Sequence, residues 1–313
     1  MTTMRTLGFM SLLTLGLLTG TGGPALAASC CGGASITDQF TVPKWERWMA
    51  GGSLQLDHTF DMRGADGERM RAESWQNDET RLLLGGAYRL SKNWQAAGVL
   101  PLTYRRVTRG EETGHGFGPG DLSVQLRYEI MDEETCFLLP FRELTWDELK
   151  PSIHWVATVN APTGRPTHRS LDALGASVTG SGYWTVDTGP QITKIWGAWG
   201  NSLDVQVGYQ TFGGDDHGHA HPDAFRWRVG GSLLYYPAYQ QYLGVHVGHQ
   251  REIPFGEEDL TGVEQTTVSL IGSYRHKGDG LWLRGSFGSA GLLQGRNAPV
   301  GLTGMVTVAW AFM

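Results

Sequence analysis

The sequence predicts an all-β protein, a transmembrane antiparallel up-and-down β-barrel of about 12 strands. Apolar and polar residues alternate along long segments, which is typical of strands with one apolar face. Most of these segments reach the roughly 9 to 11 residues that a tilted strand needs to cross a bilayer. After residue 27 no run supplies the roughly 20 consecutive apolar residues of a membrane helix.

The composition agrees with a closely packed β-structure. The chain holds 45 Gly and 12 Trp in 313 residues, and its charged fraction of 18% lies below that of ordinary soluble domains. The net charge of -6 provides no basic face, so we expect no nucleic-acid partner.

The first 27 residues have the pattern of a secretory signal peptide. Arg5 precedes an apolar stretch that ends at Leu18, and small residues at 25–27 form a cleavage pattern. We therefore expect a signal peptide at 1–27, a Cys- and Gly-containing periplasmic N-terminal lead-in at 28–44, and an outer-membrane β-barrel at 45–313. Lipidation of Cys30 is left open, because the residues before it depart from a lipobox.

Period-two alternation defines each strand in turn. Between Leu122 and Ile130, every second residue is apolar and the residues between them are Ser, Gln, Arg and Glu. The same reasoning predicts strands at 46–61, 77–90, 93–106, 120–131, 150–161, 182–195, 201–212, 224–236, 241–250, 264–276, 280–289 and 301–312. An even number of long strands favours a closed barrel.

The connections between these strands alternate between short and long. Short turns at 90–93, 196–200, 236–240 and 276–280 suit the periplasmic side, where the N-terminus is expected. Longer outer loops are expected near 62–76, 107–119, 162–181, 213–223, 251–263 and 290–300. The stretch 132–149 breaks this rhythm as a periplasmic insertion, and its role is open.

A secreted β-sandwich is the alternative fold. Its strands would be shorter, and each would bury one face in protein rather than in lipid. The lengths of the predicted strands favour the barrel, in which a closed sheet pairs every backbone N–H and C=O group.

Polar residues that alternate with the lipid-facing ones are expected to line the lumen. These residues are Gln55, Asp57, Gln125, Arg127, Glu129, His154, Asn160, Asp204, Gln206, Arg226, Arg228, His246 and Arg284. About twelve strands lie between the number that side chains fill and the number that leaves a wide water channel. The sequence therefore predicts a narrow polar lumen and leaves open whether paired charges fill it.

The segment GGDDHGHAHPD at 213–223 concentrates three histidines and three aspartates in one predicted outer loop. His217, His219 and His221, with Asp215 and Asp216, are the donor types that Zn(II) or Cu(II) prefers. Its glycines and the lack of residues to orient the imidazole rings favour a solvated loop, with weak capture of Zn or Cu as the alternative. No other cofactor is expected.

The three cysteines, Cys30, Cys31 and Cys136, are an odd number for an exported protein. A disulfide between Cys136 and one of the adjacent pair is one interpretation, because neighbouring cysteines bridge each other only with strain. Thiolate binding of a soft metal by Cys30 and Cys31 is the other.

Several short motifs resemble the family of outer-membrane β-barrel transporters of the phenol meta-pathway type. They are VLPLTY at 99–104, GPGDL at 118–122, LRY at 126–128, APTG at 161–164 and TGSGYW at 179–184. The resemblance implies a passive outer-membrane channel for small molecules, hydrophobic or aromatic compounds among them, and says nothing of a particular solute.

The expected function is therefore that of a monomeric outer-membrane channel for small solutes. Its expected partners are outer-membrane lipid, a small-molecule solute and, during biogenesis, the outer-membrane assembly machinery. A metal-binding outer-membrane protein and a structural barrel with a filled lumen remain as alternatives. An enzyme is not expected, because the sequence has no Gly-x-Ser-x-Gly, His-Glu-x-x-His or phosphate-loop motif.

Overall fold

The computed structural model describes residues 39–42, 46–71, 75–131, 150–166, 169–196, 198–212, 223–238, 241–255, 262–276 and 280–312. Within these ranges almost all regular structure is β. The strands are β1 (Trp48–Arg63), β2 (Arg69–Arg71), β3 (Trp75–Arg89), β4 (Trp94–Arg109), β5 (Glu112–Pro119), β6 (Leu122–Met131), β7 (Ser152–Ala161), β8 (Tyr183–Trp196), β9 (Trp199–Phe212), β10 (Ala224–Ala238), β11 (Gln241–Pro254), β12 (Glu264–Arg275), β13 (Leu281–Arg296) and β14 (Pro299–Phe312).

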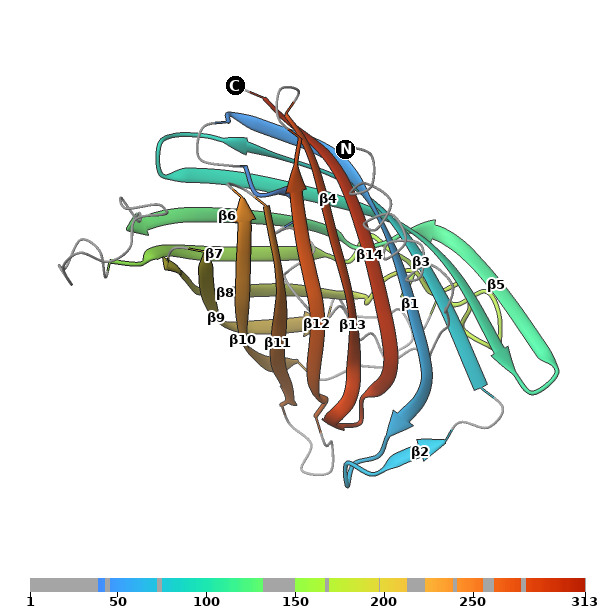
Figure 1. The fold of residues 1–313 in the computed structure, drawn as a ribbon. Helices are drawn as coiled ribbons and strands as arrows, with labels where there is room; N and C mark the ends of the chain where they lie inside the picture. Colours follow the sequence, from blue (N-terminus) through green and yellow to red (C-terminus); the bar gives the residue numbers. More distant parts are fainter. Residues whose placement is uncertain are drawn as a thin grey trace, which may run out of the picture.

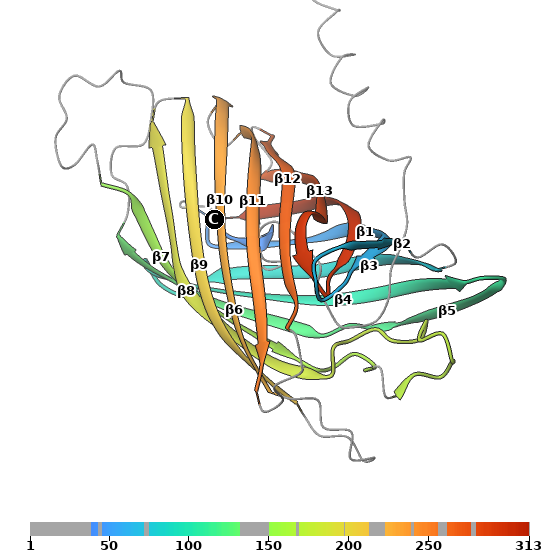
Figure 2. The same cartoon turned by 90° about the horizontal axis from the view of Figure 1, so that it is seen from below.

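Twelve of these strands form a closed antiparallel barrel. Sequential neighbours pair from β6 to β14, β4 pairs with β6 and with β3, and β3 pairs with β1. The seam between β1 and β14 closes the ring, running from Trp48 opposite Phe312 to Met62 opposite Pro299. Figure 1 shows β14 lying beside β1, and Figure 2 shows the strands curving around to this seam. The barrel prediction is confirmed, and the β-sandwich is excluded.

The two remaining strands extend the barrel at one end. β2 pairs with the end of β1, and β5 forms a hairpin with the outer half of β4. Figure 1 shows both at the end of the barrel opposite the ends Trp48 and Phe312. We call the end with Trp48 and Phe312 the terminal end and the other the loop end.

Four of the expected outer loops are partly strand, and in the one at 251–263 strand β11 continues to Pro254. The 62–76 loop contains β2, and the 107–119 loop is the turn and second strand of the β4–β5 hairpin. The expectation for 290–300 is wrong, because β13 continues to Arg296 and β14 begins at Pro299. Asn297, with φ of 48°, makes the tight turn between them.

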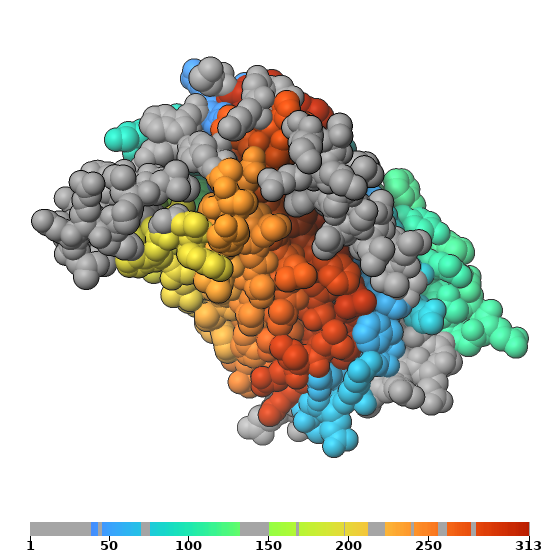
Figure 3. All heavy atoms as spheres, in the orientation of Figure 1, coloured from blue at the N-terminus to red at the C-terminus, as the bar shows by residue number. Residues whose placement is uncertain are grey.

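The outer surface of the barrel is continuous where Figure 3 shows it, over β11 to β14 and β1. Most barrel strands have 14 to 16 residues, whereas β6 and β7 have 10 each. In the described ranges, no helix has the length and apolar character to cross a membrane.

Candidate functional site

The barrel strands have an apolar outer face, and most of their polar side chains lie on the inner face. On β4, the outward Leu100 and Tyr104 are 40% and 42% exposed, whereas the inward Thr103 and Arg105 are almost fully buried. Exposed large apolar side chains on the outside of a folded protein mark a surface that contacts something other than water. The inner face therefore holds the candidate site.

All thirteen residues that the sequence assigned to the lumen alternate with these outward apolar residues. Gln55, Gln125, Gln206 and His246 are buried. The others bond to inward partners: Asn160 donates to Thr185 Oγ1 at 2.6 Å. Their position inside the barrel is described by the structure, and their role in passing a solute stays a prediction.

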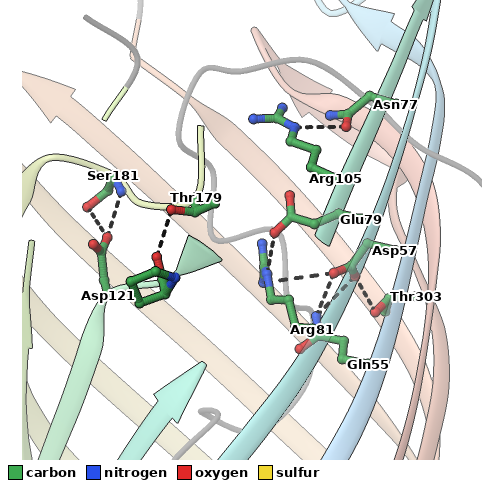
Figure 4. A network of polar contacts seen from close by, with 11 residues as sticks. Gln55, Asp57, Asn77, Glu79, Arg81, Arg105, Asp121, Thr179, Ser181 and Thr303 are labelled. Atoms are coloured by element: carbon green, nitrogen blue, oxygen red, sulfur yellow. Dashed lines mark hydrogen bonds and ion pairs between the residues drawn. The ribbon is translucent and has the colours of Figure 1, made fainter. Parts of the chain in front are cut away.

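A polar network on β1, β3 and β14 crosses the seam of the barrel (Figure 4). Gln55 Nε2 donates to Asp57 at 2.8 Å, and Thr303 Oγ1 donates to the same carboxylate at 2.6 Å. Arg81 lies 3.8 Å from Asp57 and also pairs with Glu79. The two carboxylates therefore share one guanidinium, which offsets part of the cost of burying them.

The sequence reasoning missed several members of this network. Asn77, Glu79 and Arg81 occupy every second position of the predicted strand 77–90, and Asn77 Oδ1 accepts a 2.8 Å hydrogen bond from Arg105 Nε. The alternation that identified Gln55 and Asp57 is the signal that would have found them.

A second network lies on β8 to β11. Arg228 donates to Gln206 at 2.8 Å and lies 3.6 Å from Asp204, while Arg226 lies 3.9 Å from Asp187. The carboxylates have room because glycines stand opposite them: a Cβ on Gly208 would lie 2.1 Å from Asp187 Oδ1, and one on Gly230 would lie 2.6 Å from Asp204 Oδ1. Acidic and basic groups are thus interspersed along this wall.

An apolar cluster fills part of the interior near the terminal end. Phe40 is fully buried there, and Val42 is 2% exposed. The cluster also includes Met49, Leu83, Ala87, Ala97, Val99, Trp282, Ala309 and Ala311. A Cβ on the inward Gly85 would lie 2.5 Å from the Phe40 ring, so this glycine makes room for the ring. The interior is therefore not polar throughout: apolar side chains occupy part of the lumen that the sequence predicts to be narrow and polar.

Arginines from four strands hold residues 39–42 and Glu46 in place. Arg284 Nη1 donates to the carbonyl of Gln39 at 2.6 Å, and Arg89 Nη2 donates to the carbonyl of Val42 at 3.3 Å. Arg127 contacts Thr41 Oγ1 at 3.3 Å, and Arg275 pairs with Glu46. The sequence assigned residues 28–44 to a periplasmic lead-in; the described part of that range, 39–42, packs inside the barrel, and the assignment itself stays a prediction.

Three of the motifs that resemble the transporter family, GPGDL, APTG and TGSGYW, meet at one point near the loop end. The Asp121 carboxylate accepts hydrogen bonds from Gly164 N at 3.0 Å and from both Ser181 N and Ser181 Oγ at 2.6 Å (Figure 4). Thr163 Oγ1 donates to the carbonyl of Gly120 at 2.7 Å and accepts from Leu122 N. We call these contacts the Asp121 junction.

Thr179 completes the junction. Its hydroxyl donates to the carbonyl of Pro119 at 2.7 Å (Figure 4). The same oxygen accepts a hydrogen bond from Arg165 N at 3.0 Å. Glycine is needed where the chains meet, because a Cβ on Gly164 would lie 2.6 Å from the Cα of Gly180. The motifs therefore tie the start of β6 to the long connection between β7 and β8.

That connection also covers the inward face of β5. The face consists of Gly114, Gly116 and Gly118, and a Cβ on Gly116 would lie 2.2 Å from the carbonyl oxygen of Ala176. Glycine at every second position of one strand face lets another backbone approach closely. The segment 172–179 therefore lies against the barrel interior at its loop end.

Asp172 organises this segment and gives it a pH dependence. Burial raises the pKa of its carboxyl, but hydrogen bonds from Ala176 N and Ser177 N, both 2.8 Å, outweigh burial and lower that pKa below 3.8. Because the pKa of Asp172 is lower in the folded state, its ionised carboxylate stabilises the segment at pH values above the ordinary pKa of an Asp side chain. This stabilisation is lost as the pH falls through the pKa of Asp172 in the folded state.

We expect the amides of Ala176 and Ser177 to lose protection against hydrogen exchange, relative to strand amides, as the pH falls below about 4. Exchange rates corrected for their intrinsic pH dependence would measure this. D172N should lower the protection at neutral pH and remove its pH dependence. Protection that is equal at pH 3 and pH 6 in the unmodified chain would contradict the prediction.

The predicted metal and cysteine sites lie outside the described residues. These are His217, His219, His221, Asp215 and Asp216, together with Cys30, Cys31 and Cys136. Among the residues that the structure does describe, no group of three His, Cys, Asp or Glu side chains could hold a metal ion. Both predictions stay as they were.

Comparison with solved structures places the fold among outer-membrane barrels. An outer-membrane channel from Pseudomonas putida F1 superposes with a TM-score of 0.67 at 16% identity, covering 90% of this chain and 100% of that one. The β domain of the Bordetella autotransporter BrkA has a TM-score of 0.48 at 11% identity, covering 84% and 99%. The translocator domain of the autotransporter NalP from Neisseria meningitidis has a TM-score of 0.47 at 12% identity, covering 84% of this chain and 88% of that one.

No curated protein matches the chain. A family model does: residues 80–234 match the family described as "Putative MetA-pathway of phenol degradation". This range contains all of the motifs that meet at the Asp121 junction. The resemblance predicted from the sequence is therefore confirmed, and residues 80–234 carry the sequence pattern of the phenol meta-pathway family on the fold of an outer-membrane channel.

Proposed function

We propose that this chain is an outer-membrane channel that admits small, largely apolar solutes, aromatic compounds among them, by passive diffusion. The observation that carries the proposal is the apolar cluster around Phe40, inside a barrel whose interior also holds two polar networks. Porins for hydrophilic solutes have a wetted polar interior. An apolar stretch favours solutes that leave water readily.

The outer face supports a place in a membrane. On β4 the outward residues from Trp94 to Tyr104 are apolar, and ten residues of a strand tilted by about 40° rise about 25 Å, the height of the apolar band of such barrels. Aromatic pairs lie at the terminal end. The ring centroids of Trp48 and Phe312 are 4.2 Å apart in a stacked pair, and those of Trp94 and Tyr128 are 4.7 Å apart. Trp and Tyr favour membrane interfaces.

The comparisons support the choice of solute class. The similar protein from Pseudomonas putida is an outer-membrane channel, and the description of the matching family refers to a pathway of phenol degradation. Both descriptions belong to those proteins, and they agree with an interior that combines polar walls and an apolar cluster.

Uptake of radiolabelled phenol by cells that produce the chain in their outer membrane tests the proposal. We expect faster uptake than in cells with an empty vector, and no difference for a charged sugar phosphate. Equal phenol uptake by both kinds of cell would refute the proposal.

A structural barrel with a filled interior is the second candidate. The observation that favours it is that the interior carboxylates have basic or hydrogen-bonding partners, as Asp57 has in Arg81 and Asp204 in Arg228. Such paired charges stiffen a barrel without any passage. The metal-binding alternative depends on residues outside the described ranges and gains no support here.

Replacing Phe40 separates these two candidates. In a channel, F40A should raise the single-channel conductance in planar bilayers several-fold, because it removes the largest fully buried ring from the interior. F117A is the matched control, since Phe117 is 67% exposed on the outer side of β5. If F40A stays as silent as F117A while both fold, the filled barrel is favoured.

A further inference from the structure

Four residues form a compact block on the inward face of β12 and β13. Ser273 stands opposite Arg284, and Arg275 stands opposite Trp282, in adjacent positions of the same antiparallel pair. Both guanidinium groups lie over the indole ring, with Cζ at 5.4 Å from its centroid for Arg275 and 5.1 Å for Arg284. Cationic groups over an indole face are held in place by its electron density.

Two hydrogen-bond donors in this block have no acceptor within the part of the chain that the structure describes. Ser273 is 7% exposed and Trp282 is 6% exposed, and neither Ser273 Oγ nor Trp282 Nε1 has a hydrogen-bond partner among the described residues. Buried polar groups are nearly always satisfied in folded proteins, so such exceptions need an explanation. Two donors beside two guanidinium groups are suited to an anionic acceptor.

The chain itself places a carboxylate here. Glu46, 4% exposed, pairs through Oε1 with Arg275, while its Oε2 has no hydrogen-bond partner among the described residues. Among the described residues, the ion pair between Glu46 and Arg275 therefore leaves Glu46 Oε2 without a donor, and it leaves Ser273 Oγ and Trp282 Nε1 without an acceptor. A carboxylate that is free to move can take a position that Glu46, fixed two residues before β1, does not reach.

We propose that Ser273, Arg275, Trp282 and Arg284 form a binding site for the carboxylate of a small organic acid, which competes with Glu46. The ring or chain of such an acid would pack against the adjoining apolar cluster, to which Trp282 and Phe40 both belong. The inference rests on the proposed function and narrows its solute class to amphipathic acids. Phosphate fits less well, because its second charge would face Glu46.

Binding of 4-fluorobenzoate to the folded chain in uncharged detergent tests this site by ¹⁹F NMR. 4-Fluorobenzyl alcohol, which has the same ring without the charge, reports partition into micelles. E46Q removes the competing charge with little change in shape, and we expect it to tighten binding about tenfold. W282F keeps an aromatic ring, although a smaller one, and loses the N–H, and we expect about tenfold weaker binding in the E46Q background.

Trp227 provides the control, because it contacts His249 on the outer face, and W227F should bind as the parent does. If E46Q fails to fold, W282F and S273A in the unmodified chain decide the matter. The site is overturned if E46Q binds the acid no more tightly than the unmodified chain, or if W282F has no effect. Phenol uptake or conductance without acid binding would overturn this inference alone, whereas acid binding without either would overturn only the channel.

Discussion

Replacing Asp121 with alanine is expected to lower the free energy of unfolding of the barrel by about 3 kcal/mol, since hydrogen bonds to a charged group contribute roughly 1.5–3 kcal/mol each and do not add fully. The Asp121 carboxylate accepts from two backbone N–H groups, of Gly164 and Ser181, and from the Ser181 hydroxyl. Alanine leaves all three donors without that partner. Urea titration followed by the shift in electrophoretic mobility between folded and unfolded barrel would measure the loss.

Asp66 supplies the control for Asp121. Its carboxylate accepts one hydrogen bond, from Glu68 N at 2.9 Å, in an exposed turn. D66A should therefore change the free energy of unfolding by no more than about 0.5 kcal/mol. Equal urea midpoints for D121A and D66A would show that the junction does not stabilise the barrel. D121N, which keeps one acceptor oxygen, should lie between them.

Adding one methyl group at Gly116 is expected to cost about 3 kcal/mol, the upper end of the range for overpacking. The new Cβ would lie 2.2 Å from the carbonyl oxygen of Ala176 and 2.5 Å from the Cα of Ser177. Both are main-chain atoms, which cannot rotate away as a side chain does. Either β5 or the segment 172–179 must move, and the urea midpoint of G116A should fall accordingly.

Gly98 on the outer face of β4 is the matched position. The nearest atom to its added Cβ is the carbonyl oxygen of Ser123 at 3.9 Å, an ordinary contact. G98A should therefore leave the urea midpoint unchanged or raise it slightly, because alanine loses less conformational freedom on folding than glycine. A midpoint for G116A that matches that of G98A would mean that the segment 172–179 does not pack on β5.

Strand positions were predictable because the barrel imposes one simple rule on each strand. A residue such as Leu126 must face outward if Gln125 faces inward, and that rule shows in the sequence as a period of two. All twelve barrel strands of the structure overlap predicted strands. Inward positions, including Asp204 and Arg228, follow from the same rule.

The features that were missed are those in which the rule is broken or the partner is distant. Gly291, with φ of 68°, interrupts the alternation in β13, so the segment after it has the sequence of a loop. β5 has glycine on its inward face, which leaves no apolar or polar signal there. Phe40 packs against Gly85, which lies 45 positions further along the chain. The alternation of apolar and polar residues within one strand does not predict a contact between such distant residues.

The paired first and last strands place a constraint on how the protein acquires its structure. Trp48 pairs with Phe312, and most of the polypeptide lies between these two residues in the sequence. Bringing such remote segments together costs chain entropy, which slows the pairing. Until the last strand is synthesised and delivered, β1 has one unsatisfied edge that is ready to pair with any other chain. That edge of β1 therefore stays unpaired for longer than the edges of strands whose partners are neighbours in the sequence.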